Sequence, residues 1–259
     1  MRNRITIIPI AAFILAACGD KRPKASDANA AEVSAVSSES SSASAATPVV
    51  TGPVSFEEAN TAFQAKRYDE AARLLTTYTT EHPDNVWGYY LLGLSAWKTG
   101  ERDRAVDAFR RALEKDSTHV KSQLNLSRVL IEQDKAQDAL PHVEAALKID
   151  SGSSEGFRLL GRVKSELGDT AGAIAAYQHA IVLDGRDAWS MNNLARVYLD
   201  QGRFQESLGP LARAIEIDST VTAFQHNLGI ALKGLKQDSA TADLSGLARG
   251  FVEQTKSWH

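Results

Sequence analysis

The sequence predicts an all-α solenoid in which pairs of helices repeat along the chain. The first observation is a period of 34 residues, because several columns of similar residues return at this spacing. Two columns hold alanine, and a third holds only small residues. The columns are Ala71, Ala105, Ala139 and Ala173; Ala112, Ala146, Ala180 and Ala214; and Ala59, Gly93, Ser127, Gly161, Ala195 and Gly229. Small side chains at fixed points let two antiparallel helices approach closely, while larger apolar residues fill the space between them.

The second observation concerns the residues between the helices. Gly100, Gly168 and Gly202 stand where the two helices of a pair would join, and glycine most easily adopts the positive φ found beyond a helix end. An aspartate column falls between successive pairs, at Asp116, Asp150, Asp184 and Asp218. Because one pair cannot bury its own faces, we expect neighbouring pairs to stabilise each other.

A third observation comes from the C-terminal end. An apolar stripe there has the i, i+3, i+4, i+7, i+8 spacing of one helix face. The stripe consists of Leu244, Leu247, Ala248, Phe251 and Val252. This pattern predicts a capping helix that closes the end of the solenoid.

Composition excludes several classes of function. The 259 residues carry 29 Lys and Arg against 32 Asp and Glu, a net charge of −3, whereas nucleic-acid binders usually carry a basic excess. A single cysteine allows no intramolecular disulfide and no Cys-based zinc site. None of the six histidines stands in a metal-binding motif, and no P-loop, GxSxG or GxGxxG occurs. We therefore expect no enzyme, no catalytic residue, no metal, no cofactor and no nucleic-acid partner.

The N-terminus has the features of a secretory signal peptide. A positively charged start precedes an apolar run over residues 5–15, which is too short to span a bilayer as a stable helix. The run ends in Leu15-Ala16-Ala17-Cys18, which resembles the bacterial lipobox. The resemblance implies cleavage before Cys18 and lipidation of its sulfur; the alternative is an ordinary signal peptide with an incidental cysteine. Asp20 lies one place beyond the position that favours inner-membrane retention, which favours the periplasmic face of the outer membrane.

The chain therefore divides into three predicted regions. Residues 1–17 form the signal peptide. Residues 18–52 hold the lipidated cysteine and a Ser/Ala-rich tether, which cannot bury enough surface to offset its ordering entropy. Residues 53–259 form the repeat domain, with units near 53–85, 86–119, 120–153, 154–187 and 188–221, and a partial unit plus capping helix over 222–259.

The repeat domain resembles the tetratricopeptide repeat (TPR) family. The family motif has W-x2-L-G-x2-Y in the first helix and A-x3-F-x2-A in the second. The best match is Leu160-Gly161 with Ala173, Tyr177 and Ala180. The resemblance implies a right-handed superhelix of five to six helix-turn-helix repeats. It also implies a non-enzymatic scaffold whose first helices line a concave groove that binds a segment of another protein.

The ligand-contacting positions of that motif, carried onto this chain, define an aromatic group near the first two pairs. It consists of Phe56, Asn60 and Phe63, followed by Trp87, Tyr90, Leu94 and Trp97. Exposed aromatic patches are typical of interaction sites. The alternative is that about half of these rings pack between helices.

The same positions define an arginine group further along. Arg128, Arg162 and Arg196 are 34 residues apart, and each stands four residues before an acid at Glu132, Glu166 or Asp200. Each arginine could pair with the acid on its own helix and form a solvated ladder. Alternatively, the three guanidinium groups could grip acidic side chains or backbone carbonyls of a bound segment. The remaining predicted groove residues are Asn125, Arg158, Asn193 and Asn227.

The predicted function is a lipid-anchored scaffold or adaptor in the bacterial envelope, with envelope proteins or their peptide segments as partners and an assembly factor as the first choice. An adaptor for peptidoglycan hydrolases is the alternative. A self-associating structural lipoprotein, dimerising through the region of Trp87, is a third possibility. The carboxylate clamp that binds chaperone C-termini is absent, because Phe56 stands where the clamp needs lysine.

Overall fold

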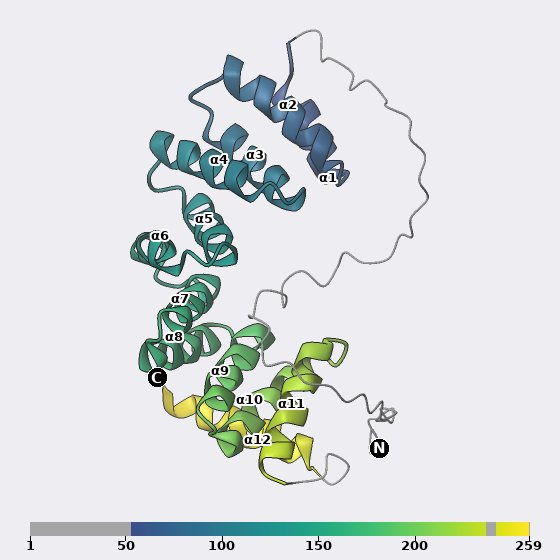
Figure 1. Ribbon diagram of the computed structural model, residues 1–259, viewed down its shortest axis with the longest axis vertical. Coiled ribbons are helices and arrows are strands. Elements are labelled where there is room, and N and C mark those ends of the chain that lie inside the picture. The colour runs from purple at the N-terminus through teal and green to yellow at the C-terminus, as the bar shows by residue number, and fades with distance from the viewer. Residues whose placement is uncertain (1–52, 237–241, 259) are drawn as a thin grey trace, which may run out of the picture. The chain divides into compact units, whose positions relative to one another are not determined.

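The computed structural model describes residues 53–236 and 242–258, and these ranges hold twelve α-helices and a short 3-10 helix without any strand (Figure 1). The first helices of the pairs are α1 (Phe56–Gln64), α3 (Val86–Lys98), α5 (Val120–Glu132), α7 (Ser154–Glu166), α9 (Ala188–Asp200) and α11 (Thr222–Gly234). The second helices are α2 (Tyr68–Glu81), α4 (Arg102–Lys115), α6 (Ala136–Ile149), α8 (Thr170–Leu183) and α10 (Phe204–Ile217). The helices α12 (Leu244–Thr255) and η2 (Lys256–Trp258) follow. The predicted signal peptide, Cys18 and the tether lie outside the described residues.

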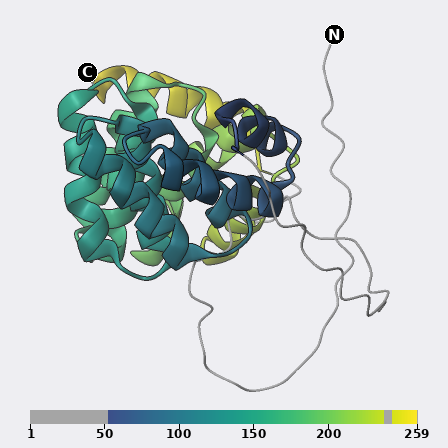
Figure 2. The same ribbon diagram turned by 90° about the horizontal axis from the view of Figure 1, so that it is seen from above.

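Successive helix pairs stack side by side, as both views show (Figures 1 and 2). From α3 to α9, each odd-numbered helix packs on its own even-numbered partner and on the even-numbered helix of the preceding pair. Every odd-numbered helix also contacts the next odd-numbered one. The odd-numbered helices therefore form one continuous surface, which we call the odd-helix wall. The prediction of an all-α superhelical repeat fold is confirmed.

The small-residue column marks the point where the two helices of a pair cross. A Cβ on Gly93 would lie 2.6 Å from the ring of Phe109, and one on Gly161 would lie 2.6 Å from the ring of Tyr177. Ser127 fits the same place because its hydroxyl donates to the carbonyl oxygen of Ala139 on the partner helix, at 3.3 Å. Residues in this column are small because an aromatic ring or backbone of the second helix lies directly against them.

The turn within each pair has one conformation throughout. Gly100, Gly168 and Gly202 have φ of 84°, 80° and 69°, as the sequence predicts. Three residues other than glycine share the conformation at the same 34-residue spacing: Lys66, Asp134 and Lys236. The left-handed turn therefore belongs to the repeat itself. Where glycine occupies it, the steric strain of a Cβ at positive φ is avoided.

The aspartate column ends the second helices. Asp116, Asp150, Asp184 and Asp218 are the C-cap residues of α4, α6, α8 and α10. Each carboxylate accepts a hydrogen bond from the backbone N–H two residues further on, at 2.9–3.2 Å. This local bond turns the chain out of one pair and into the next.

The last helix does not complete a sixth pair. Helix α12 packs along α10 and reaches α8, and Phe251 joins the buried cluster around Tyr177 and Phe224. Gly229, which occupies the small-residue column on α11, has no described atom within 4 Å of an added Cβ. Among the described residues, none therefore covers α11 at Gly229. No helix in the described ranges is long and apolar enough to cross a membrane.

Candidate functional site

The predicted groove residues all lie on odd-numbered helices. They are Phe56, Asn60 and Phe63 on α1; Trp87, Tyr90, Leu94 and Trp97 on α3; Asn125 and Arg128 on α5; Arg158 and Arg162 on α7; Asn193 and Arg196 on α9; and Asn227 on α11. The structure gives these residues different environments, which separate those that hold the repeats together from those that are open to a ligand.

Trp87 is the most exposed of the predicted aromatic residues. Its side chain is 48% accessible, yet its ring has fixed neighbours. The edge-to-face partners are Tyr90, with centroids 5.7 Å apart, and His119, with centroids 4.8 Å apart. The Lys121 ammonium lies 5.2 Å from the Trp87 ring centroid. An oriented aromatic ring with an open face and an adjacent cation can receive an apolar or aromatic group.

The two phenylalanines of α1 serve the interior of the first pair. The Phe56 ring packs 5.6 Å from that of Tyr78, and the Phe63 ring packs 5.5 Å from that of Tyr68, both on α2. Both phenylalanines are partly buried against the first core cluster. This is the arrangement that the alternative interpretation of the aromatic group expects, so the open aromatic surface is concentrated at Trp87.

Trp97 joins the aromatic group to the arginine group. Its indole N–H donates to Glu132 Oε2 at 2.9 Å, and Arg102 Nε lies 3.4 Å from the same oxygen. The Arg128 guanidinium carbon lies 5.4 Å from the centroid of the Trp97 ring. The sequence predicts two separate patches, whereas α3, α4 and α5 connect them in one network.

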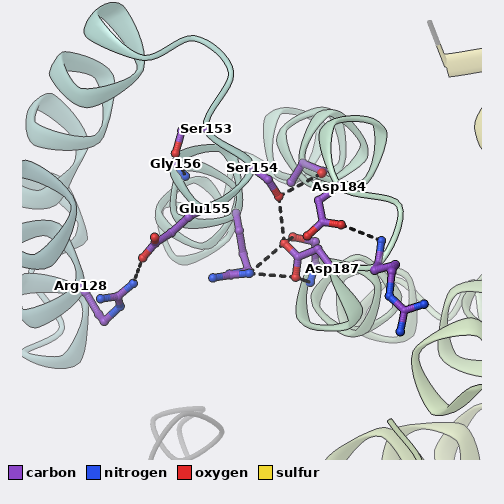
Figure 3. Close-up of polar contacts among 11 residues, drawn as sticks. Arg128, Ser153, Ser154, Glu155, Gly156, Asp184 and Asp187 are labelled. Carbon is purple, nitrogen blue, oxygen red and sulfur yellow. Dashed lines mark hydrogen bonds and ion pairs between the residues drawn. The ribbon is translucent and has the colours of Figure 1, made fainter. Parts of the chain in front are cut away.

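Arg128 forms its ion pair across repeats rather than with the acid on its own helix. Its Nη1 donates to Asn125 Oδ1 at 2.6 Å, and its Nη2 donates to Glu155 of α7 (Figure 3). Asn125 Nδ2 in turn donates to the Lys121 carbonyl at 2.8 Å. The predicted i,i+4 bridge between Arg128 and Glu132 is therefore not formed, because each group has a partner on a neighbouring helix.

The Tyr90 hydroxyl belongs to the same network. Burial raises its pKa above the usual value, and the nearby positive charge of Arg128 and a hydrogen bond with Asn125 oppose that effect. The polar groups of Tyr90, Asn125, Arg128 and Glu155 thus engage one another, which rigidifies this part of the wall.

Arg158 is a structural tie between repeats. Its Nη1 lies 2.8 Å from both carboxylate oxygens of Asp187, whose side chain is only 3% exposed. Asp187 caps α9 by accepting from the Ser190 backbone N–H at 3.0 Å and hydroxyl at 2.6 Å, and it also receives the Ser154 hydroxyl at 3.3 Å (Figure 3). Motif positions did not point to Asp187. The sequence could have indicated Asp187 through its place in the 34-residue column of N-capping residues, which also includes Asn85 and Ser153.

Asn227 is also used between repeats. It is buried, and its Nδ2 donates to Asn192 Oδ1 on α9 at 2.8 Å. Asn192 is fully buried and lies beside the predicted Asn193. An amide pair at this depth aligns α9 with α11, since an unsatisfied partner would carry a desolvation penalty.

Arg162 and Arg196 are less engaged than the other arginines of the wall. Arg162 Nε lies 3.3 Å from Glu166 Oε1, which is the predicted i,i+4 pair. Within the part of the chain that the structure describes, no hydrogen bond or ion pair engages the partly buried Arg196. Burial raises the pKa of Glu166, and the charges of Arg162 and Arg196 both oppose that shift. Arg162 contacts this carboxylate, whereas Arg196 acts on it through its charge without bonding to it.

No metal-binding cluster accompanies these residues. Across 53–236 and 242–258, no three His, Cys, Asp or Glu side chains gather into a group that could hold an ion.

Comparison with known proteins identifies the class of fold. Models described as tetratricopeptide repeat match residues 56–100, 90–154 and 188–217. The chain therefore contains tetratricopeptide repeats, as the motif resemblance implies.

Two curated relatives share parts of this sequence. The BBSome complex member bbs-4 of Caenorhabditis elegans is 42% identical over 59 residues, which are 23% of this chain. Superkiller complex protein 3 of Homo sapiens is 26% identical over 200 residues, which are 74% of this chain. The match spans 13% of the length of each relative.

Solved structures share the fold at low sequence identity. MamA 41-end from Desulfovibrio magneticus RS-1 superposes with a TM-score of 0.59 and 19% identity, over 63% of this chain and 93% of that chain. TTC0263 from Thermus thermophilus gives 0.57 and 20%, over 68% and 96%. YrrB, described as a TPR protein with an unusual peptide-binding site, gives 0.56 and 19%, over 66% and 88%.

Proposed function

We propose that this protein is a non-enzymatic scaffold that binds an extended segment of another protein along its odd-helix wall. The wall runs without interruption from α1 to α11, because each odd-numbered helix contacts the next. Its side chains offer an open aromatic ring at one end and unengaged guanidinium donors further along. A peptide-binding site is also described for the structural neighbour YrrB.

Trp87 is the observation that carries this proposal. Trp87 is 48% exposed, so the free protein leaves apolar ring surface in contact with water. A partner that covers this surface would gain the favourable free energy of burying it. Here Tyr90 and His119 hold it edge-on, so little side-chain entropy is lost when a partner covers it. Exposed, preorganised aromatic side chains beside a cation are typical anchors of protein interfaces.

The cellular setting that we propose is the bacterial envelope. Lipidation of Cys18 would hold the scaffold at the periplasmic face of the outer membrane, and residues 18–52 would let the repeats reach partners beside that membrane. An assembly factor for envelope complexes is the first choice within this setting, and an adaptor for peptidoglycan hydrolases is the second.

The binding proposal is tested by in-cell crosslinking followed by affinity purification of the full chain. We expect Trp87→Ala to lose partners that the wild type captures. Leu183→Ala is the matched control, because Leu183 is also an exposed apolar residue, 41% accessible, but it ends an even-numbered helix. Equal capture by both variants would contradict the proposal. A crosslink from the Trp87 region to a second copy of the chain would instead support the self-associating alternative.

The anchoring proposal has a separate test. Cells fed a labelled fatty acid should incorporate the label into the wild type and not into Cys18→Ser. Unchanged label and membrane fractionation in the variant would overturn the lipobox interpretation without affecting the binding proposal.

A further inference from the structure

The arginines of the odd-helix wall differ in how many acceptors the protein supplies to them. Arg128 donates through Nη1 to Asn125 and through Nη2 to Glu155. Arg158 lies at 2.8 Å from both oxygens of Asp187. These two guanidinium groups are neutralised by carboxylates of neighbouring repeats, so they position helices rather than await a ligand.

Arg196 stands at the same repeat position as Arg128 but has no such partner. It is partly buried, and among the described residues none accepts a hydrogen bond from it. A guanidinium remains protonated at any physiological pH and carries five N–H donors. No nitrogen of Arg196 is among the buried, unpartnered atoms of the described residues, so its N–H groups face solvent. They are therefore open to an anionic oxygen from outside the chain, with which they would form charge-assisted hydrogen bonds.

Arg162 supplies further donors next to it. Its single ion pair uses Nε, at 3.3 Å from Glu166, and leaves Nη1 and Nη2 without an acceptor among the described residues. Helices α7 and α9, which carry the two arginines, are in contact. Burial raises the pKa of the Glu166 carboxyl and that of the Tyr177 hydroxyl, and the positive charges of both arginines oppose each shift.

The acidic groups near these two arginines engage few of their N–H donors. Across the described ranges, Glu166 is the one carboxylate that forms an ion pair with either arginine, and its interaction is single and long. Arg158 adds positive charge near Tyr177, but Asp187 neutralises it. Asp134 adds a further negative charge near Glu166, since its charge raises the pKa of that carboxyl. Arg162 and Arg196 nevertheless form only one ion pair between them among the described residues, so most of their N–H groups have no carboxylate acceptor there.

We propose that Arg196, together with the Nη groups of Arg162, forms a subsite for a carboxylate of the bound protein segment. The subsite would receive either an Asp or Glu side chain or the C-terminal carboxylate of the segment. This inference rests on the proposed function, since it assigns the chemistry of the ligand that lies on the wall. It implies a segment with an aromatic or apolar group for Trp87 and an acidic group for Arg196.

The test selects a random dodecapeptide library against the full chain, in wild type and two variants. Wild-type binders should be enriched both in aromatic residues and in carboxylates. Arg196→Gln should abolish the enrichment in carboxylates and keep that in aromatic residues, whereas Trp87→Ala should do the reverse. Arg67→Gln is the control, because it removes the same charge from an exposed pair outside the odd-numbered helices.

Synthetic versions of one selected peptide then distinguish the two sources of the carboxylate. One version replaces each acidic side chain by its amide, and the other amidates the C-terminus. The version that lacks the recognised carboxylate should bind the wild type about tenfold more weakly, as expected when a charge-assisted hydrogen bond is lost. Arg196→Gln should not discriminate between the versions, and Arg196→Lys should discriminate less than the wild type because it lacks the planar fork.

The outcomes separate this inference from the function on which it rests. Aromatic enrichment without any enrichment in carboxylates would overturn the Arg196 subsite and leave the binding wall intact. Enrichment in carboxylates that survives in Arg196→Gln would also overturn it. A library without specific binders in any form of the protein would overturn both proposals. Circular dichroism of each variant checks that the helices persist.

Discussion

The two ends of the odd-helix wall use equivalent positions differently. Between α3, α5 and α7, Arg128 is engaged by Asn125 and Glu155, and the exposed surface is the Trp87 ring. Between α7, α9 and α11, Arg196 at the equivalent position is unengaged by any described residue. The first end is rigid and presents an apolar ring, whereas the second end presents donors.

The difference has a simple cause in the neighbouring repeat. The residue 27 places after Arg128 is Glu155, which accepts its hydrogen bond. The corresponding residue for Arg162 is Trp189, and for Arg196 it is Ala223. A repeated residue is therefore a structural link in one unit and a free donor in another, depending on what the next unit supplies.

The largest expected effect is that of removing the tie between α7 and α9. Asp187→Ala removes the α9 cap and leaves Arg158 without its buried acceptor, so we expect a loss of about 3 kcal/mol in the free energy of unfolding. Urea unfolding followed by circular dichroism measures it. Glu70→Ala breaks the exposed pair with Arg67 and should cost less than about 1 kcal/mol. Equal effects of the two variants would show that the Asp187 tie is no stronger than a surface pair.

We expect a smaller difference in stability between alanine variants of the two tryptophans of α3. Trp97→Ala removes the hydrogen bond to Glu132 and the contact with Arg128, so it should destabilise the fold by about 2 kcal/mol. Trp87→Ala should cost less than about 1 kcal/mol, because its side chain is largely exposed. Thermal unfolding of both variants provides the comparison. A larger loss for Trp87→Ala would mean that this ring belongs to the core rather than to a binding surface.

The small-residue column offers a test with opposite signs at two places. Gly161→Ala places a Cβ 2.6 Å from the Tyr177 ring and should destabilise by about 1–2 kcal/mol. Gly229→Ala meets no described atom within 4 Å and should stabilise by about 0.5–1 kcal/mol, since alanine favours the helix. Chemical denaturation of the two variants measures both effects. Destabilisation by Gly229→Ala would show that α11 is covered at Gly229 in solution.

The smallest effect concerns pH at the aromatic end. Burial lowers the pKa of His119, Lys121 adds to that effect and Asp116 opposes it. The unfolded chain then binds a proton more readily than the folded one, so the stabilisation present above the unfolded pKa of about 6.5 falls as the pH drops through it. Unfolding midpoints should decrease between pH 7.5 and 5.5 in the wild type.

His119→Gln should show a shallower decrease over the same range. Burial also lowers the pKa of His142, so part of the pH dependence of the wild type should come from this residue. The variant His142→Gln measures that part. An unchanged slope in His119→Gln would mean that the pKa of this imidazole is the same in the folded and unfolded chain.

Much of the site could be located from sequence, but its connections could not. Motif positions placed every predicted groove residue on an odd-numbered helix, and the 34-residue spacing anticipated the equivalence of Arg128, Arg162 and Arg196. The predicted ladder along single helices formed at Arg162 and Glu166 but not at Arg128 and Glu132. Asp187 and Asn192, which tie α9 to its neighbours, were not among the predicted residues.

The sequence by itself determined the features that depend on local chain geometry. A small residue at the crossings, a left-handed residue at the turn within a pair and an aspartate at the end of four of the second helices recur every 34 residues, because each acts within one pair or in the short turn that follows it. Only the tertiary structure decided which charges meet. Trp97 and Glu132, Arg128 and Glu155, and Arg158 and Asp187 belong to different repeats. Their pairing depends on how far one helix is displaced and rotated against the next, and a repeat period does not specify that.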